Sequence, residues 1–304
     1  MLLYEGMFIR WPHHNETRYQ SWSGLTLSNT KRKVLVMQRP GLTLTELLVV
    51  IGIVAVLIAL LIPSLHRSRL QAKATVCNSN VRQLSQVLFT YATDNGKFPY
   101  GFYSKFGIQP PDGGFAGNQQ YDRKGWWWFN YLKGLYKKSI GRQTVLQCPS
   151  KQLQHTDLEN DILCGNYGVN LTICKMPMGT ISQQEFVGEP RAITEVTHPS
   201  QALLLIDSGY AIISWWHAAD IPPVLLGNSI IEDTAYVPGL KINKDRLFWP
   251  GGGQNYDALF GRHPRKMVNI GYLDGHVAIS EADSLLVEKK PDGYNNLVPL
   301  WRQR

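Results

Sequence analysis

The most pronounced pattern in the sequence is one long apolar run, followed by a polar segment that carries an apolar stripe. Residues 42–62 are mostly Leu, Ile, Val and Ala, and Glu46 is the only charged residue among them. A helix of about 20 apolar residues has the length needed to cross the ~30 Å hydrocarbon core of a bilayer. We therefore expect a membrane-spanning helix over residues 42–63. The alternative is a helix buried in a soluble core, although such helices are usually shorter and less uniformly apolar.

Residues 64–93 continue the helical pattern but are amphipathic. Their apolar positions recur at alternating spacings of four and three, which places them on one face of a helix. The stripe consists of Leu70, Ala74, Cys77, Val81, Leu84, Leu88 and Tyr91. The turn residues 94–96 end the pattern. We expect one helix of roughly 75–80 Å whose second half lies on a globular domain, with Pro63 at the place where a kink would occur.

Residues 94–304 form the expected head. A buried strand is predicted over residues 201–207, and Asp274-Gly275 between the apolar segments 268–273 and 276–279 is a strong hairpin signal. Loops are expected over residues 97–125 and 218–260, a short helix over 126–136, and a short strand over 145–150. The predicted fold class is α+β, with the amphipathic half of the helix lying across an antiparallel sheet.

Composition indicates a globular chain and gives no sign of a nucleic-acid partner. The 304 residues are 44% hydrophobic and 18% charged, with a formal net charge of +8. Lys and Arg are scattered through the head and also flank the apolar run on both sides, at residues 31–39 and 67–73. The two sides of the apolar run therefore carry similar numbers of Lys and Arg residues, and the positive-inside rule does not set the orientation of the helix in a membrane.

Glu46 and the residues before it resemble the signal of type IV prepilins and type II secretion pseudopilins. A carboxylate inside a bilayer is costly and normally has a partner and a purpose. In that signal, a short basic leader ends in Gly, and the apolar helix that follows has Thr second and Glu fifth. The matching residues are Gly41, Leu42, Thr43, Leu44 and Glu46, and Arg39 and Pro40 precede them. Family members more often carry Phe at the position of Leu42 and Ile or Val at that of Thr45.

The resemblance implies a processing and assembly mechanism. A membrane prepilin peptidase would cleave after Gly41 and methylate the new amine of Leu42. Glu46 would then pair with the N-terminal amine of a neighbouring pilin or pseudopilin subunit, because two buried opposite charges neutralise each other. The alternative is that Glu46 only reaches the cytoplasmic headgroups.

The resemblance also implies a location. The chain would be a single-pass inner-membrane protein with a cytoplasmic N-terminus, and its head would lie in the periplasm or in a surface filament. Residues 1–41 would be the leader. Because prepilin leaders are short and Met37 begins a complete one, we expect residues 1–36 to be an artefact of start-site assignment, and we exclude them from fold reasoning.

The four cysteines, Cys77, Cys148, Cys164 and Cys174, show no CxxC spacing, so no structural zinc site is expected. Outside the cytoplasm they could form disulfides in three connectivities, among which the sequence does not choose. Four reduced buried thiols are the alternative. The resemblance favours Cys77 with Cys148, because related chains often carry one Cys after the anchor and another in a Cys-Pro-Ser segment.

A second resemblance lies near the C-terminus. His263, Asp274 and Gly275 resemble the His, nine residues, Asp-Gly signature of large pilin-like proteins, although ten residues separate His263 from Asp274 here. That difference raises the question of a strand bulge or a shifted register.

The sequence gives little evidence for a catalytic or metal site in this region. His263, Asp274 and His276 invite a metal or acid–base interpretation, and Asp207 follows a buried strand. Asp274 is explained as a turn residue, however, and the chain contains none of the common catalytic motifs. We expect no catalytic residues, metal or cofactor. Four loop residues could donate oxygens to Ca²⁺, but nothing fixes them in one loop; they are Asp94, Asn95, Asp112 and Asp122.

Two function classes remain. The first is a pilin-like structural subunit that assembles through its N-terminal helix. The second is a membrane-anchored extracytoplasmic binding protein that uses the prepilin route only for export, with Trp127 or Trp215 contacting glycan. Substitution of Glu46 separates them, because only the first class needs its charge.

Overall fold

The computed structural model describes residues 43–103, 125–132, 144–153, 162–177, 185–223, 235–248 and 256–302. The leader and the predicted cleavage pair, Gly41 and Leu42, lie outside these residues. The chain divides into two compact units, Met1–Val54 and Ala55–Arg304, and the boundary falls within the first helix.

The first helix, α1 (Leu44–Asn95), is continuous and passes through Pro63. A capping box begins it: the Thr43 N–H donates to Glu46 Oε2 at 2.8 Å, and the Glu46 N–H donates to Thr43 Oγ1 at 3.2 Å. Gly96, with φ of +76°, follows its end and supplies the left-handed conformation that commonly terminates helices. The single long helix is therefore confirmed, with each end two residues from its predicted position.

The two parts of α1 differ in burial. Residues 44–69 are all exposed, and this part is long and apolar enough to cross a membrane. Further along, Cys77, Val81, Leu84 and Leu88 are buried in the core, and the other three residues of the predicted stripe are half-buried. The amphipathic half is thus confirmed as a packing face.

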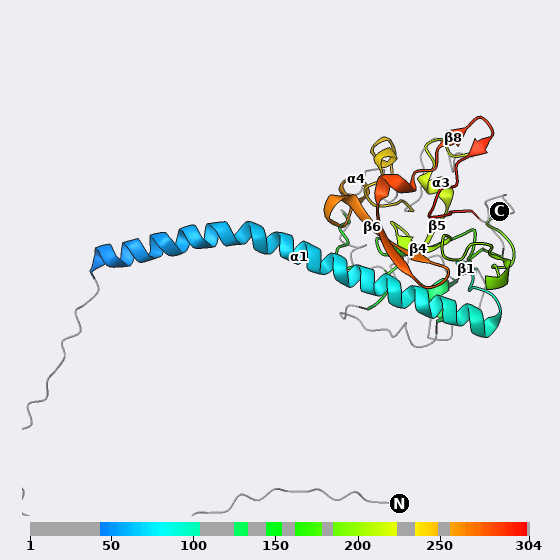
Figure 1. Ribbon diagram of the computed structural model, residues 1–304, viewed down its shortest axis with the longest axis horizontal. Coiled ribbons are helices and arrows are strands. Elements are labelled where there is room, and N and C mark those ends of the chain that lie inside the picture. The colour runs from blue at the N-terminus through cyan, green and yellow to red at the C-terminus, as the bar shows by residue number, and fades with distance from the viewer. Residues whose placement is uncertain are drawn as a thin grey trace, which may run out of the picture. The chain divides into compact units, whose positions relative to one another are not determined.

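The remaining elements belong to the second unit (Figure 1). The strands are β1 (Phe102–Tyr103), β2 (Trp126–Trp127), β3 (Tyr167–Asn170), β4 (Leu203–Asp207), β5 (Ile212–Ile213), β6 (Met267–Tyr272), β7 (Val277–Glu281), β8 (Lys289–Lys290) and β9 (Gly293–Tyr294). The short helices are η1 (Trp128–Tyr131), η2 (Ile193–Glu195), α3 (Trp215–Ala218), η3 (Lys241–Asp245), α4 (Tyr256–Phe260), η4 (Pro264–Lys266) and η5 (Ala282–Leu285).

The central sheet has the strand order β5-β3-β4-β6-β7. All its pairs are antiparallel except β3 with β5, which are parallel. The expected antiparallel sheet is therefore a mixed one. After β4 the chain turns back across Gly168, where an added Cβ would lie 2.6 Å from the Tyr210 carbonyl oxygen. This close crossing brings β5 alongside β3 in the same direction.

The predicted hairpin is confirmed as β6 and β7. Gly275 has φ of +88° in its turn, and Asp274 Oδ1 accepts the His276 N–H at 3.1 Å. The β6–β7 register runs without a shift, and the irregularity of this sheet lies instead in β4, between Leu203 and Leu205. The ten-residue spacing of the signature thus produces no bulge within the hairpin.

Several local predictions were wrong. The loops expected over residues 97–125 and 218–260 contain the short elements β1, η3 and α4. The segment from Val145 to Ser150 is a series of turns instead of a strand, and Trp126–Trp127 pairs as β2 with β1 before the short helix η1 begins. Pro149 lacks the N–H that a strand ladder needs, which favours a turn at Cys148-Pro149-Ser150.

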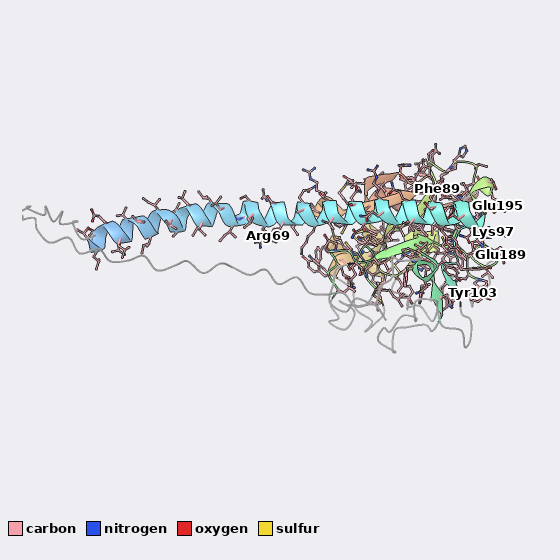
Figure 2. The ribbon with its side chains drawn as sticks, turned by 90° about the horizontal axis from the view of Figure 1, so that it is seen from below. Arg69, Phe89, Lys97, Tyr103, Glu189 and Glu195 are labelled. Atoms are coloured by element: carbon pink, nitrogen blue, oxygen red, sulfur yellow. The ribbon has the colours of Figure 1, made fainter. Side chains whose placement is uncertain are left out.

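The buried half of α1 contacts the sheet directly. Asn78 Nδ2 donates to Asn269 Oδ1 on β6 at 3.0 Å, and Asn80 Nδ2 donates to the Tyr167 hydroxyl on β3 at 3.2 Å. Beyond the helix, Lys97 forms an ion pair with Glu189 at 3.6 Å near the C-terminal end of α1 (Figure 2). Helix, sheet and the loop around residue 189 therefore form one packed body within the second unit.

Candidate functional site

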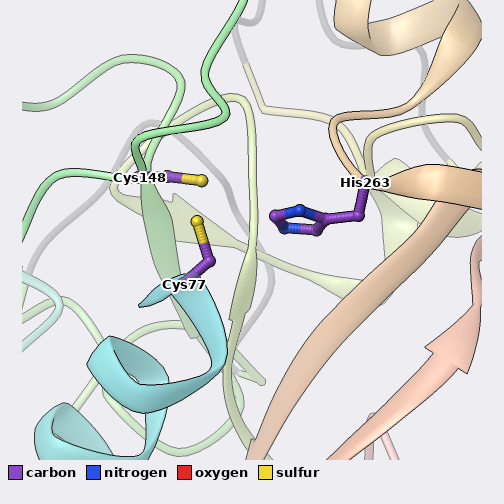
Figure 3. A group of neighbouring side chains, drawn as sticks. All are labelled: Cys77, Cys148 and His263. Carbon is purple, nitrogen blue, oxygen red and sulfur yellow. The ribbon is translucent and has the colours of Figure 1, made fainter. Parts of the chain in front are cut away.

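Three side chains that are distant in sequence converge beside the buried half of α1. They are Cys77 on α1, Cys148 in the Cys-Pro-Ser turn, and His263 just before η4. Their ligand atoms, the two sulphurs and a ring nitrogen, all lie within 4.8 Å of one another (Figure 3). The residues are 0%, 4% and 5% exposed. We refer to these three residues as the Cys-Cys-His cluster.

Hydrogen bonds between the Asn166 side chain and backbone groups position the Cys148 turn. The Cys148 N–H donates to the Asn166 side-chain oxygen at 2.9 Å, and the Asn166 amide donates to the carbonyls of Ile162 and Cys164, both at 3.0 Å. Asn166 is 1% exposed. A buried amide that satisfies three backbone groups holds this turn against the start of β3.

The orientation of His263 is set by Asp207, the last residue of β4. His263 Nε2 lies 3.1 Å from Asp207 Oδ2, and the same oxygen accepts the Asn269 backbone N–H at 2.7 Å and its side-chain amide at 3.0 Å. Among the described residues, neither His263 Nδ1 nor Asp207 Oδ1 has a hydrogen-bond partner. The Asn269 amide nitrogen also lies 3.0 Å from His263 Nε2. The Nε2 edge of the imidazole is therefore held by two side chains, while Nδ1 has no hydrogen-bond partner in the described part of the chain.

The cluster is strongly polarised. The hydrogen bond from Cys148, with a further contribution from His263, lowers the pKa of Cys77 to about 5 against the effect of burial. Burial raises the pKa of the Cys148 thiol, and the neighbouring Cys77 raises it further. Burial acts to lower the pKa of His263, but the Asp207 carboxylate raises it to about 9. The pKa shifts of Cys77 and His263 therefore both favour the charged form of the side chain.

A second buried ion pair lies beside the cluster. Arg262 Nε donates to Asp257 Oδ2 at 2.6 Å, and its two other nitrogens donate to the carbonyls of Asn166 and Ser208 at 2.7 and 2.6 Å. Both charged side chains are 0% exposed. The Tyr236 hydroxyl donates to the other carboxylate oxygen at 2.5 Å. These bonds hold α4, β3 and the end of β4 together.

The predicted signature residues do not form one site. His263 lies before β6 in the Cys-Cys-His cluster, whereas Asp274 lies in the turn after it, so β6 separates them. Asp274 instead contacts His276 at 2.5 Å on the partly exposed hairpin, and His276 stacks on Tyr272. Sequence reasoning considered Asp207 and His263, but it did not connect them with each other or with the cysteines.

The expected disulfide partners are adjacent, but both thiols are free in the structure. The two cysteines that the resemblance pairs are therefore neighbours, and the disulfide between them stays a prediction. His263, which sequence reasoning did not place near them, gives the two cysteines a third partner.

Among the described residues, the carboxylate of Glu46 accepts hydrogen bonds only from Thr43. In addition to the capping bonds, its Oε2 accepts the Thr43 hydroxyl at 2.8 Å. The charge pairing of Glu46 with a neighbouring chain therefore stays a prediction, and local capping is the function that the structure gives this side chain. Of the loop oxygens considered for Ca²⁺, Asp112 and Asp122 lie outside the described residues.

The tryptophans proposed as a glycan platform are part of the core. Trp127 is 0% and Trp215 3% exposed. Trp127 packs against Phe102 and Tyr210, and Trp215 packs against Trp216 and Tyr294. Because a stacking surface for sugars must be accessible, these residues do not support the glycan-binding alternative.

No protein-family model, curated protein or solved structure matches this chain. The resemblance to prepilins therefore rests on the chain's own residues and on the physical properties of α1.

Proposed function

We propose that this chain is a membrane-anchored, pilin-like subunit that is cleaved after Gly41, methylated on Leu42, and assembled into a type IV pilus or a type II secretion pseudopilus. The observation that carries the proposal is the difference in burial between the two parts of α1. One continuous helix has an exposed apolar first part with a single carboxylate, and a second part that is integral to the core of the head.

The apolar side chains in the exposed part of α1 need to be shielded from water. Its large apolar side chains are about half exposed or more over several consecutive turns, and soluble monomers rarely present so large a continuous apolar surface. Lipid covers such a helix before assembly, and the equivalent helices of other subunits cover it in a filament.

The continuity of α1 argues against a signal peptide that is discarded. The same helix that is exposed at Val54 buries Cys77, Val81 and Leu84. Cleavage after Gly41 would leave both parts on the mature protein, whereas removal of the apolar part would cut through a helix that the head uses for packing. The head therefore stays attached to its anchor.

Two variants of Glu46 test the proposal. Glu46→Gln keeps an oxygen that can accept the Thr43 N–H, because both Glu and Gln serve in capping boxes, but it removes the charge. Glu46→Ala removes both. In cells with a cognate assembly machine, we expect both variants to be processed and membrane-bound but absent from sheared filaments. The amount of the protein in the filament fraction is measured against the membrane pool.

The matched control is Glu281→Gln, an exposed Glu on β7 of the head, which should assemble as the wild type does. If Glu46→Gln assembles normally and only Glu46→Ala fails, then Glu46 acts as a helix cap and the proposed charge pairing is wrong.

A further inference from the structure

We propose that the Cys-Cys-His cluster binds one Zn²⁺ ion, with Cys77, Cys148 and His263 as ligands and Asp207 as a positioning residue. This site is independent of the proposed assembly function, since it lies wholly within the head. It also offers an alternative to a Cys77–Cys148 disulfide, because both sulphurs would be metal ligands.

The distances fit a tetrahedral ion with small adjustments. Zn–S bonds of about 2.3 Å and Zn–N bonds of about 2.0–2.1 Å place ligand atoms roughly 3.5–3.8 Å apart. The three ligand atoms already lie within 4.8 Å of one another. Closing the remaining gap requires side-chain movements on the order of 1 Å, which small rotations about staggered rotamers provide.

His263 is oriented as a metal ligand. Its Nε2 lies 3.1 Å from the Asp207 carboxylate and 3.0 Å from the Asn269 side-chain amide, so we assign Nδ1 as the ring nitrogen that binds the metal. Histidines that bind metals almost always donate their other ring N–H to a carboxylate, a carbonyl or water. Within the described part of the chain, Nδ1 has no hydrogen-bond partner although His263 is 5% exposed. A metal ion would satisfy this buried nitrogen.

The donor set favours zinc over the hard cations. Thiolate and imidazole ligands suit Zn²⁺, whereas Mg²⁺ and Ca²⁺ prefer oxygen. Two thiolates neutralise the charge of the ion, so the bound centre adds no net charge to a buried site. Three protein ligands leave one tetrahedral position for water. The ion would link α1, the Cys148 turn and the segment before β6.

The experiment measures metal in the full-length protein purified in detergent without chelators. We expect about one zinc ion per chain by elemental mass spectrometry, and an absorption spectrum with thiolate-to-metal bands after replacement by Co²⁺. The variants Cys77→Ser, Cys148→Ser and His263→Gln should each lose most of the zinc. Cys174→Ala is the matched control, because Cys174 is also fully buried but is not in the cluster, and it should retain the metal.

Asp207→Asn tests positioning separately from folding. It should weaken zinc affinity by about 10–100-fold, measured by competition with a chelating indicator, while the Co²⁺ protein keeps its thiolate bands. If Asp207 only supported the fold, the variant would unfold more easily but the folded fraction would bind zinc with unchanged affinity.

Two results would overturn the proposal, and the first needs only the wild-type protein, whether or not the variants fold. Zinc-free protein that yields a Cys77–Cys148 linked peptide after non-reducing digestion would show that the pair is a disulfide. Zinc that persists in all three ligand variants would place the metal elsewhere.

Discussion

Gly271 on β6 shows how one residue sets the distance between helix and sheet. An added Cβ would lie 1.9 Å from Ser85 Oγ on α1. We therefore predict that Gly271→Ala lowers the free energy of unfolding by about 1–3 kcal/mol, as expected for overpacking. Urea unfolding followed by tryptophan fluorescence measures the change.

A double-mutant cycle identifies the cause. The Ser85 hydroxyl has no hydrogen-bond partner among the described residues, so Ser85→Ala alone should change stability little. In the Ser85→Ala variant, the nearest atoms to the new Cβ are the Cβ of residue 85 and Val81 Cγ1, at 3.2 and 3.3 Å. Gly271→Ala should then lower the free energy of unfolding by clearly less than it does in the wild-type protein. Additive effects of the two substitutions would show that the serine is not what excludes a side chain at position 271.

Loss of Arg262 should strongly destabilise the head. Arg262→Met leaves the Asp257 carboxylate buried and unpaired, and it also removes donors to two backbone carbonyls. Breaking a buried pair in this way typically costs about 3–5 kcal/mol. The measurement is again urea unfolding. Lys290→Met, which breaks a solvent-exposed pair with Glu288, should leave the unfolding midpoint unchanged; an equal loss in both variants would refute the special role of Arg262.

At the scale of elements, α1 offers matched positions for testing the membrane segment. Val50 and Val54 are 52% and 46% exposed, and Leu65 and Val76 are 52% and 47% exposed. The pair Val50→Arg and Val54→Arg places two charges at lipid depth, at about 2.5–3.5 kcal/mol each. We predict that this double variant is recovered largely outside the alkali-resistant membrane fraction.

The double variant Leu65→Arg and Val76→Arg is the control, and it should remain in the membrane fraction. The four positions of the two double variants share one helix and have similar exposure in the structure, so only the surrounding medium distinguishes the two pairs. Equal extraction of both variants would contradict a membrane location for the first part of α1.

Elements with a strong local signal could be predicted from the sequence. The long helix and its end near residues 94–96, strand β4 and the Asp-Gly hairpin all follow from periodicity and turn chemistry that act within a few residues. The parallel strand β5 could not be predicted, because Ile212–Ile213 is too short to show a period. Its pairing with β3 depends on the crossing at Gly168, which is a tertiary contact.

The candidate site was predictable only in pieces. Sequence reasoning selected Cys77, Cys148, Asp207 and His263 for separate reasons, but their convergence depends on how α1, the Cys148 turn and β6 pack together. The absence of a CxxC spacing correctly described the sequence, yet it says nothing about ligands that come from three separate segments. Asn269 was missed because a polar residue inside a predicted strand gives no sign of whether it faces Asp207 or solvent.

At the scale of the whole molecule, one helix carries an exposed apolar segment and also contributes to the core of the head. The anchoring role predicts that the mature protein retains all of α1 and begins at Leu42. We predict that Gly41→Glu blocks this processing, because the small residue before the cleaved bond is replaced by a large charged one. Gln38→Glu introduces the same charge three residues earlier and serves as the control, which should be processed normally.

The most direct test is the intact mass and N-terminal peptide of the protein isolated from membranes of cells that contain a prepilin peptidase. The account predicts a chain that begins at Leu42 with a methylated amine, and an uncleaved precursor for Gly41→Glu. An unprocessed wild-type chain recovered in the soluble fraction, or a normal Leu42 terminus in the Gly41→Glu variant, would contradict it.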